Sequence, residues 1–142
     1  MSEIFKYGIG IYSEFPLDLR TLTHCEEPIT QESTHADILH VHQKTLQEHP
    51  LLFSTITDDD AFIKHHKEQL KNVHIITLRE NEVREQPILL EFSGDAQTRF
   101  EHILIIAKKH SQATILESVL GDALYRSAVV EIVLEEGSTV TY

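Results

Sequence analysis

The sequence predicts a mainly β protein with a small helical region near its N-terminus, in which the β part is a short β-solenoid or a β-sandwich. Two observations lead to this expectation. From residue 72 onward the apolar runs are short, rich in β-branched residues and separated by polar turns. Three of these segments also resemble one another at a regular spacing, which favours the solenoid over the sandwich.

Composition and charge narrow the class of protein. The chain has 142 residues, of which 41% are hydrophobic, and this suits one packed domain of ordinary size. Its 23 acidic and 12 basic residues give a net charge of −11. We therefore expect no nucleic-acid partner and no anionic membrane surface as partner, because phosphate contacts need Lys and Arg.

Three further features indicate a cytoplasmic protein. No apolar run approaches the roughly 18 residues that a membrane span needs. The first residues, MSEIFKYGIG, lack the basic and apolar segments of a signal peptide. The single cysteine, Cys25, excludes an internal disulfide and fits a reducing compartment.

Residues 1–71 are predicted to form an N-terminal strand followed by a helical region. The strand is indicated by apolar residues that alternate along the chain, at Phe5, Tyr7, Ile9 and Ile11. Residues 13–31 are expected to be irregular because two prolines interrupt them. Two helices follow, over residues 34–47 and 58–71, and each begins near a threonine and acidic residues that can cap it. On the second helix, His66 is expected at the edge of the core.

Residues 72–142 are predicted to form the β region. The segments ITLRENEVRE, IIAKKHSQATILE and IVLEEGSTVTY each contain an apolar strand, a charged turn and a β-branched strand. Leu78, Ala107 and Leu134 correspond in these segments, 29 and 27 residues apart. The run ILIIA, residues 103–107, is apolar at every position, which is typical of a strand buried on both faces.

A family resemblance adds to this reading. The stretches FEHILIIAKKHSQATILESV and SAVVEIVLEEGSTVTY, with DDAFIKHHKEQLKNVHIITLRENEVREQPILLEF before them, resemble the SufB/SufD family of iron–sulfur cluster assembly proteins. The resemblance covers about residues 55–142. It implies a right-handed parallel β-helix preceded by a helical region, and a scaffold that works with a SufC-like ATPase and a SufB-like subunit.

The chain departs from the family in two respects. Family members are usually much longer, and the segment with which they contact the ATPase has no counterpart here. The SufB-like branch also tends to carry a cysteine shortly after a glutamate, whereas Glu117 is followed by Ser118 and Val119. The chain therefore looks like a short or truncated SufD-type protein.

On this resemblance we expect a non-enzymatic scaffold or interaction subunit of iron–sulfur cluster assembly. The sequence contains no nucleophile elbow and no phosphate-binding loop. The isolated chain is expected to hold no cofactor, because cluster sites normally need several thiolates and the sequence has one. Cluster binding is expected only within a larger complex.

The alternative is a metal- or small-ligand-binding protein that uses the histidine-rich helical region. Ten histidines are present, and imidazole is a common metal ligand. The weak candidates for ligands are Cys25, His40 and His42. On a helix His40 and His42 would diverge by about 200°, whereas on a strand they would share a face. The predicted helix therefore argues against this site.

The last segment, SAVVEIVLEEGSTVTY, predicts self-association. In a solenoid each coil is covered by the next one, and a coil without a neighbour leaves strand edges that invite another chain to pair. We expect a two-fold homodimer formed through these C-terminal strands. The residues expected in the shared core are Val130, Ile132, Val140 and Tyr142.

Overall fold

The computed structural model describes most of the chain beyond His49 and shorter stretches before it. The described residues are 3–7, 13–17, 23, 30–33, 38–42, 49–57, 61–93, 98–121 and 125–142. Cys25 and both ends of the predicted 34–47 helix lie outside these ranges.

The first two strands form a small sheet of their own. β1 (Glu3–Tyr7) pairs antiparallel with β2 (Ser13–Leu17). The predicted N-terminal strand is thus confirmed over the residues of β1. The expected irregular structure over residues 13–31 is wrong where β2 lies and again at Thr30, where β3 (Thr30–Ser33) begins.

Of the two predicted helices, only the second is found in the described residues. α2 (Ala61–Gln69) confirms the helix predicted over residues 58–71. The helix predicted over residues 34–47 is wrong in its described part, because this part is strand β4 (Ile38–His42). β4 pairs antiparallel with β5 (Asn72–Leu78), so its backbone groups are satisfied by a neighbouring strand, and this pairing overrides the local capping signals.

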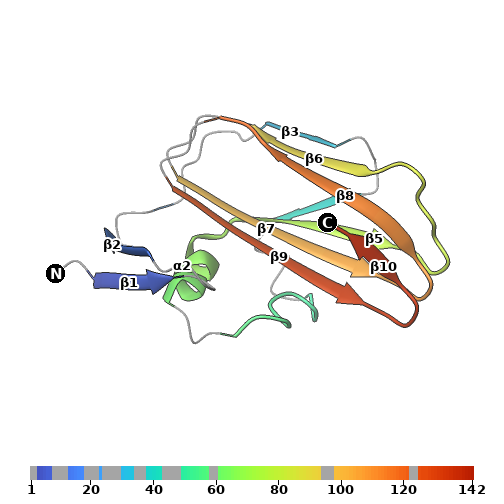
Figure 1. The fold of residues 1–142 in the computed structure, drawn as a ribbon, viewed down its shortest axis with the longest axis horizontal. Coiled ribbons are helices and arrows are strands. Elements are labelled where there is room, and N and C mark those ends of the chain that lie inside the picture. Colours follow the sequence, from blue (N-terminus) through green and yellow to red (C-terminus); the bar gives the residue numbers. More distant parts are fainter. Residues whose placement is uncertain are drawn as a thin grey trace.

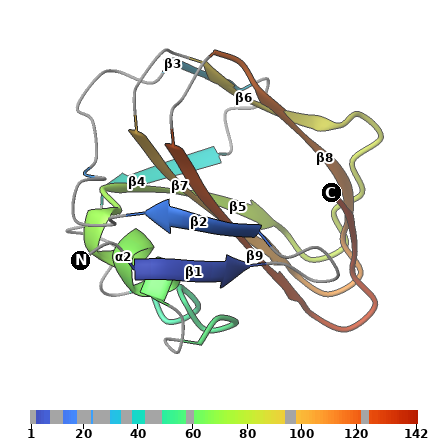
Figure 2. The same ribbon diagram turned by 60° about the vertical axis from the view of Figure 1, so that its left-hand side comes forward.

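The other strands build two open sheets that face each other (Figures 1 and 2). The first sheet has the order β4-β5-β7-β9, in which β7 is Thr98–Ala107 and β9 is Tyr125–Leu134. The second has the order β10-β8-β6-β3, in which β6 is Ile88–Ser93, β8 is Gln112–Val119 and β10 is Thr139–Thr141. Each sheet contains three parallel strands and one antiparallel strand at an edge.

The predicted right-handed parallel β-helix is wrong as a fold class. Apart from the β1-β2 pair, the described strands form two separate open sheets with one short helix, and no sheet among them is closed or wound as a solenoid. Two of the edge strands, β3 and β4, come from segments that were predicted to be irregular or helical. Strands apolar on both faces are expected in either arrangement, so the apolar pattern alone does not separate the two.

The internal repeat is confirmed by the strand register. Leu78 pairs with Ala107, and Ala107 pairs with Leu134, so the three aligned positions are neighbours across the first sheet. The turns after these positions are also equivalent. The third residue of each turn has a left-handed backbone, with φ of 60° at Asn81, 57° at His110 and 70° at Gly137.

Two apolar layers hold the fold together. The inner layer lies between the two sheets and consists of Ile76, Leu78, Ile88, Leu90, Phe92, Ile103, Ile105, Ala107, Ala113 and Ile115, with Val130 and Val140 packed against it. The outer layer lies on the other face of the first sheet, where residues 51–53 and Leu70 cover Val73, Ile75, Leu104 and Ile106. β7 is therefore buried on both faces, as predicted for residues 103–107.

Candidate functional site

Three buried polar side chains interrupt the outer apolar layer. His66 on α2 and His102 on β7 are fully buried, and Glu131 on β9 is 1% exposed. His102 lies on the same face of β7 as Leu104, and Glu131 lies on the same face of β9 as Val133. Both faces are turned toward residues 51–53 and α2. The network therefore joins the helix, two strands and the segment of residues 49–57.

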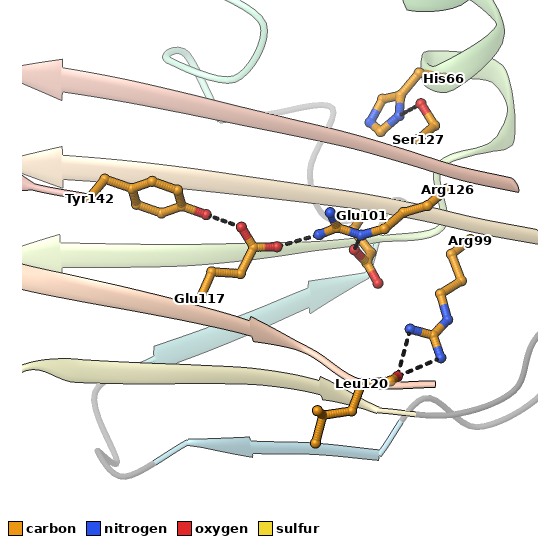
Figure 3. Close-up of polar contacts among 8 residues, drawn as sticks. All are labelled: His66, Arg99, Glu101, Glu117, Leu120, Arg126, Ser127 and Tyr142. Carbon is orange, nitrogen blue, oxygen red and sulfur yellow. Dashed lines mark hydrogen bonds and ion pairs between the residues drawn. The ribbon is translucent and has the colours of Figure 1, made fainter. Parts of the chain in front are cut away.

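The three side chains and Ser127 form one continuous chain of hydrogen bonds. The distances are 2.8 Å from Ser127 Oγ to His66 Nδ1, 3.2 Å from His66 Nε2 to His102 Nδ1, and 2.9 Å from His102 Nε2 to Glu131 Oε1. Figure 3 shows the first of these contacts.

The carboxylate fixes the direction of this chain. An ionised carboxylate only accepts, so His102 donates from Nε2 and, when neutral, accepts at Nδ1. His66 must then donate from Nε2 and accept at Nδ1, which makes the hydroxyl of Ser127 the first donor. All four groups are satisfied with a single arrangement of protons.

Glu131 is held in place by the segment of residues 49–57. The backbone N–H of Phe53 donates to Oε1 at 2.6 Å, and the N–H and hydroxyl of Thr55 donate to Oε2 at 3.0 and 2.7 Å. Burial alone would raise the pKa of Glu131, but hydrogen bonds from Thr55, Phe53 and His102 outweigh it and lower the pKa. The buried carboxylate therefore stays ionised.

Both histidines are neutral near pH 7. Burial lowers the pKa of His66 to about 4, with smaller contributions from the nearby imidazoles of His102 and His65. Burial also lowers the pKa of His102, and Lys67 adds to this, while the hydrogen bond and charge of Glu131 act in the opposite direction. Each ring therefore carries a single N–H proton near pH 7, as the hydrogen-bond directions require.

A second polar cluster lies near the start of β7 and β9, on the side of the inner layer (Figure 3). Arg126 Nε donates to Glu101 at 2.6 Å, and its guanidinium also pairs with Glu117, which accepts from the hydroxyl of Tyr142 at 2.5 Å. Burial would lower the pKa of Arg126, but the charges of Glu101 and Glu117 raise it. Burial and the hydrogen bond to Glu117 raise the pKa of Tyr142. These four side chains tie together β7, β8, β9 and the residue that follows β10.

Arg99 is the most deeply buried charge in the described residues. It is fully buried, and both terminal nitrogens of its guanidinium lie 3.4 Å from the carbonyl oxygen of Leu120 (Figure 3). Arg99 Nε and Glu101 Oε1 have no hydrogen-bond partner among the described residues. Within the described residues the second cluster therefore leaves one carboxylate oxygen of Glu101 without a donor, whereas all four groups of the Ser127–Glu131 network are hydrogen-bonded.

Both sheets end in an edge strand on the same side of the structure. β9 has a sheet neighbour only in β7, and β10 only in β8, within the described part of the chain. Apolar side chains on or next to these edges are exposed: Ile132 by 37%, Leu134 by 53% and Tyr142 by 46%. Among the predicted interface residues, Ile132 and Tyr142 are thus exposed, whereas Val130 and Val140 pack against the inner layer.

The metal site suggested for Cys25, His40 and His42 stays a prediction. His40 and His42 lie on β4 rather than on a helix, opposite His74 and Asn72 of β5, and Cys25 lies outside the described ranges. No three His, Cys, Asp or Glu side chains with described positions are placed to hold a metal ion.

None of the described helices is long and apolar enough to cross a membrane.

Sequence reasoning missed the network around Glu131. His66, expected at the edge of the core, is completely buried, and Ser127, His102 and Glu131 were not singled out. The signal was present in FEHILIIA and AVVEIVL, where polar residues stand within apolar strands. A buried polar residue needs a partner, so such positions indicate a network.

Comparison with known proteins gives no relative. No family model, no curated protein and no solved structure matches this chain. The resemblance to the SufB/SufD family therefore stays a prediction based on the quoted sequence stretches.

Proposed function

We propose that this chain is a non-enzymatic interaction subunit of the SufB/SufD type that acts in iron–sulfur cluster assembly. The sequence support is the resemblance over about residues 55–142. The structural observation that carries the proposal is the pair of edge strands β9 and β10, which leave apolar side chains exposed next to open backbone groups.

These edges are suited to pairing with another chain. An open strand edge presents N–H and C=O groups that a second strand can satisfy, and neighbouring apolar side chains add burial. β9 has ten residues, which is long for an edge strand. Ile132 and Leu134 near its end would be covered by a partner. The partners proposed are a second copy of this chain, a SufB-like subunit and a SufC-like ATPase.

The cluster belongs to the complex in this proposal. The described residues contain no group of three side chains that could hold a metal ion, and the one thiol, Cys25, can supply a single ligand at most. The isolated chain would then contribute an interaction surface to the assembly rather than a complete cluster site. We also propose a cytoplasmic location, on the evidence of the single cysteine.

A co-purification experiment tests the proposal. The tagged chain is mixed with a purified SufC-like ATPase and a SufB-like subunit, and retained proteins are quantified. We expect the wild type to retain the SufB-like subunit, and the Ile132→Lys variant to retain at least tenfold less of it. The lysine would place a charge in the interface between β9 and the partner. Leu116→Lys is the matched control, since Leu116 is 50% exposed on β8, an interior strand of its sheet. Failure of the wild type to retain either protein would overturn the proposal.

A further inference from the structure

We propose that Ser127 is an activated nucleophile, which accepts an acyl group from an activated ester at the open edge of β9. The geometry that points to this is the directed hydrogen-bond chain from Ser127 through His66 and His102 to Glu131. A nucleophile within hydrogen-bond reach of a base, which is itself oriented by a third group, is the arrangement that activates serine in proteins.

His66 is the base in this arrangement. Its Nδ1 already accepts the hydrogen bond of the Ser127 hydroxyl at 2.8 Å, and its Nε2 is engaged with His102 at 3.2 Å. The imidazole is therefore in the tautomer that can take the proton from serine. His102 and Glu131 are positioning residues, because they act through His66 and do not touch Ser127.

Proton transfer along this hydrogen-bond chain also moves the positive charge from His66 to His102, beside the carboxylate of Glu131. When His66 takes a proton at Nδ1, it can pass its Nε2 proton to Nδ1 of His102. The charge then rests on His102, 2.9 Å from the ionised Glu131, instead of on His66 alone. This offsets the low basicity that burial gives to His66, since a buried cation is stabilised by an adjacent carboxylate.

The edge of β9 supplies a donor for the developing oxyanion. The N–H of Glu135 donates to the carbonyl of Ala107 in β7, and the register between β7 and β9 is unbroken from Tyr125 to Leu134. In a parallel ladder alternate residues turn their N–H toward the same neighbour. The N–H of Ser127 therefore faces β7, and that of Ala128 faces the open side. Ala128 is exposed, so an ester carbonyl can reach this N–H beside the hydroxyl.

The chemical step balances without a further reagent. Ser127 Oγ forms a bond to the ester carbonyl carbon, and the bond from that carbon to the leaving oxygen breaks, with its electron pair staying on that oxygen. The serine proton goes to His66 Nδ1. An alkoxide leaving group takes this proton, whereas a phenolate leaves without it and the proton exchanges with water. The product is an acyl ester on Ser127.

Acetylation by p-nitrophenyl acetate tests the proposal on the full chain. We expect one equivalent of p-nitrophenolate to be released in a burst, with the acetyl group located on Ser127 by peptide mass mapping. Ser127→Ala should abolish the burst. Ser118→Ala is the matched control, because Ser118 is also a half-buried serine on a strand, and it should leave the burst unchanged. His66→Gln should slow the acetylation of Ser127 about 100-fold, the usual contribution of a general base.

The pH dependence of the acetylation rate distinguishes a serine activated by the buried His66 from a serine beside a histidine of ordinary pKa. Because His66 stays neutral down to a pKa of about 4, the rate of acetylation should change less than twofold between pH 8 and pH 5. An imidazole with an unperturbed pKa near 6.5 would lose more than 90% of the rate over that range. Folded wild type that shows no acetyl group on Ser127, or acetylates Ser118 equally fast, would overturn the proposal. So would an unchanged rate in a folded His66→Gln variant.

Discussion

Gly137 lies directly against the imidazole ring of His110: a Cβ added at Gly137 would fall 2.4 Å from His110 Nδ1. The two residues occupy the same position in consecutive turns of the repeat, and both have a positive φ. The N–H of His110 donates to the carbonyl of Glu136 at 3.1 Å, so the turns are also hydrogen-bonded to each other. Position 137 therefore requires glycine both for its backbone conformation and for the space beside His110.

Gly137→Ala is expected to lower the free energy of unfolding by about 2–4 kcal/mol. A left-handed backbone costs a residue with a Cβ roughly 1–2 kcal/mol, and displacing the ring of His110 adds to this. Urea unfolding followed by circular dichroism measures the change. In a His110→Ala background the same substitution should cost less, because only the backbone strain remains. Equal costs in both backgrounds would show that the ring contact contributes nothing.

These turns show how far the sequence predicts the structure. The spacing of Leu78, Ala107 and Leu134 predicts the parallel register, because pairing residues in successive strands repeat the same pattern of strand and turn. The same spacing does not say into how many sheets the strands assemble. Alternation between two open sheets depends on contacts between layers, and these contacts involve residues far apart in the sequence.

The N-terminal strands and the buried network illustrate what local patterns miss. β4 is a strand because β5 offers it an edge, and nothing within residues 38–42 reports that edge. Likewise Glu131 is an acidic residue within an apolar strand, and the donors that satisfy it in its buried place come from Phe53 and Thr55, 78 and 76 positions away along the chain. Partners brought together by tertiary structure decide both cases.

Acidification is expected to destabilise the protein below about pH 6.5. The unfolded chain binds a proton at His66 near its ordinary pKa of 6.5, whereas the folded protein binds it only near a pKa of about 4. Stability is therefore fully present above pH 6.5 and is lost as pH falls toward 4. The pKa difference corresponds to roughly 3 kcal/mol at most.

Urea midpoints measured between pH 7.5 and 4.5 check this expectation. His66→Gln should reduce the pH dependence, because it removes the group that titrates differently in the two states. A wild type whose midpoint is flat between pH 6.5 and 5 would contradict the assignment of a neutral, buried His66.

Glu131→Ala is expected to cost about 3–5 kcal/mol of folding free energy. The substitution leaves the N–H groups of Phe53 and Thr55 and the Nε2–H of His102 without their acceptor in a buried setting. Glu135→Ala is the matched control, since Glu135 pairs with Lys108 at the surface close to the end of the same strand. Solvent screens the charges of this exposed pair, so the control should lose little stability. Similar losses in thermal stability for the two variants would mean that the network does not hold residues 49–57 to the sheet.

Self-association is expected to depend on Ile132, which lies at an open strand edge, and not on exposed apolar side chains elsewhere on the sheets. Ile132 lies on edge strand β9 and is 37% exposed, so Ile132→Lys should leave the fold intact and give a monomer of 16.3 kDa by multi-angle light scattering. Val140→Lys should instead lower stability, because Val140 packs against the inner layer between the sheets. Leu116→Lys, on an interior strand, should leave the wild-type mass unchanged. A wild type that is monomeric up to high concentration would show that the edges of β9 and β10 do not pair with a second copy.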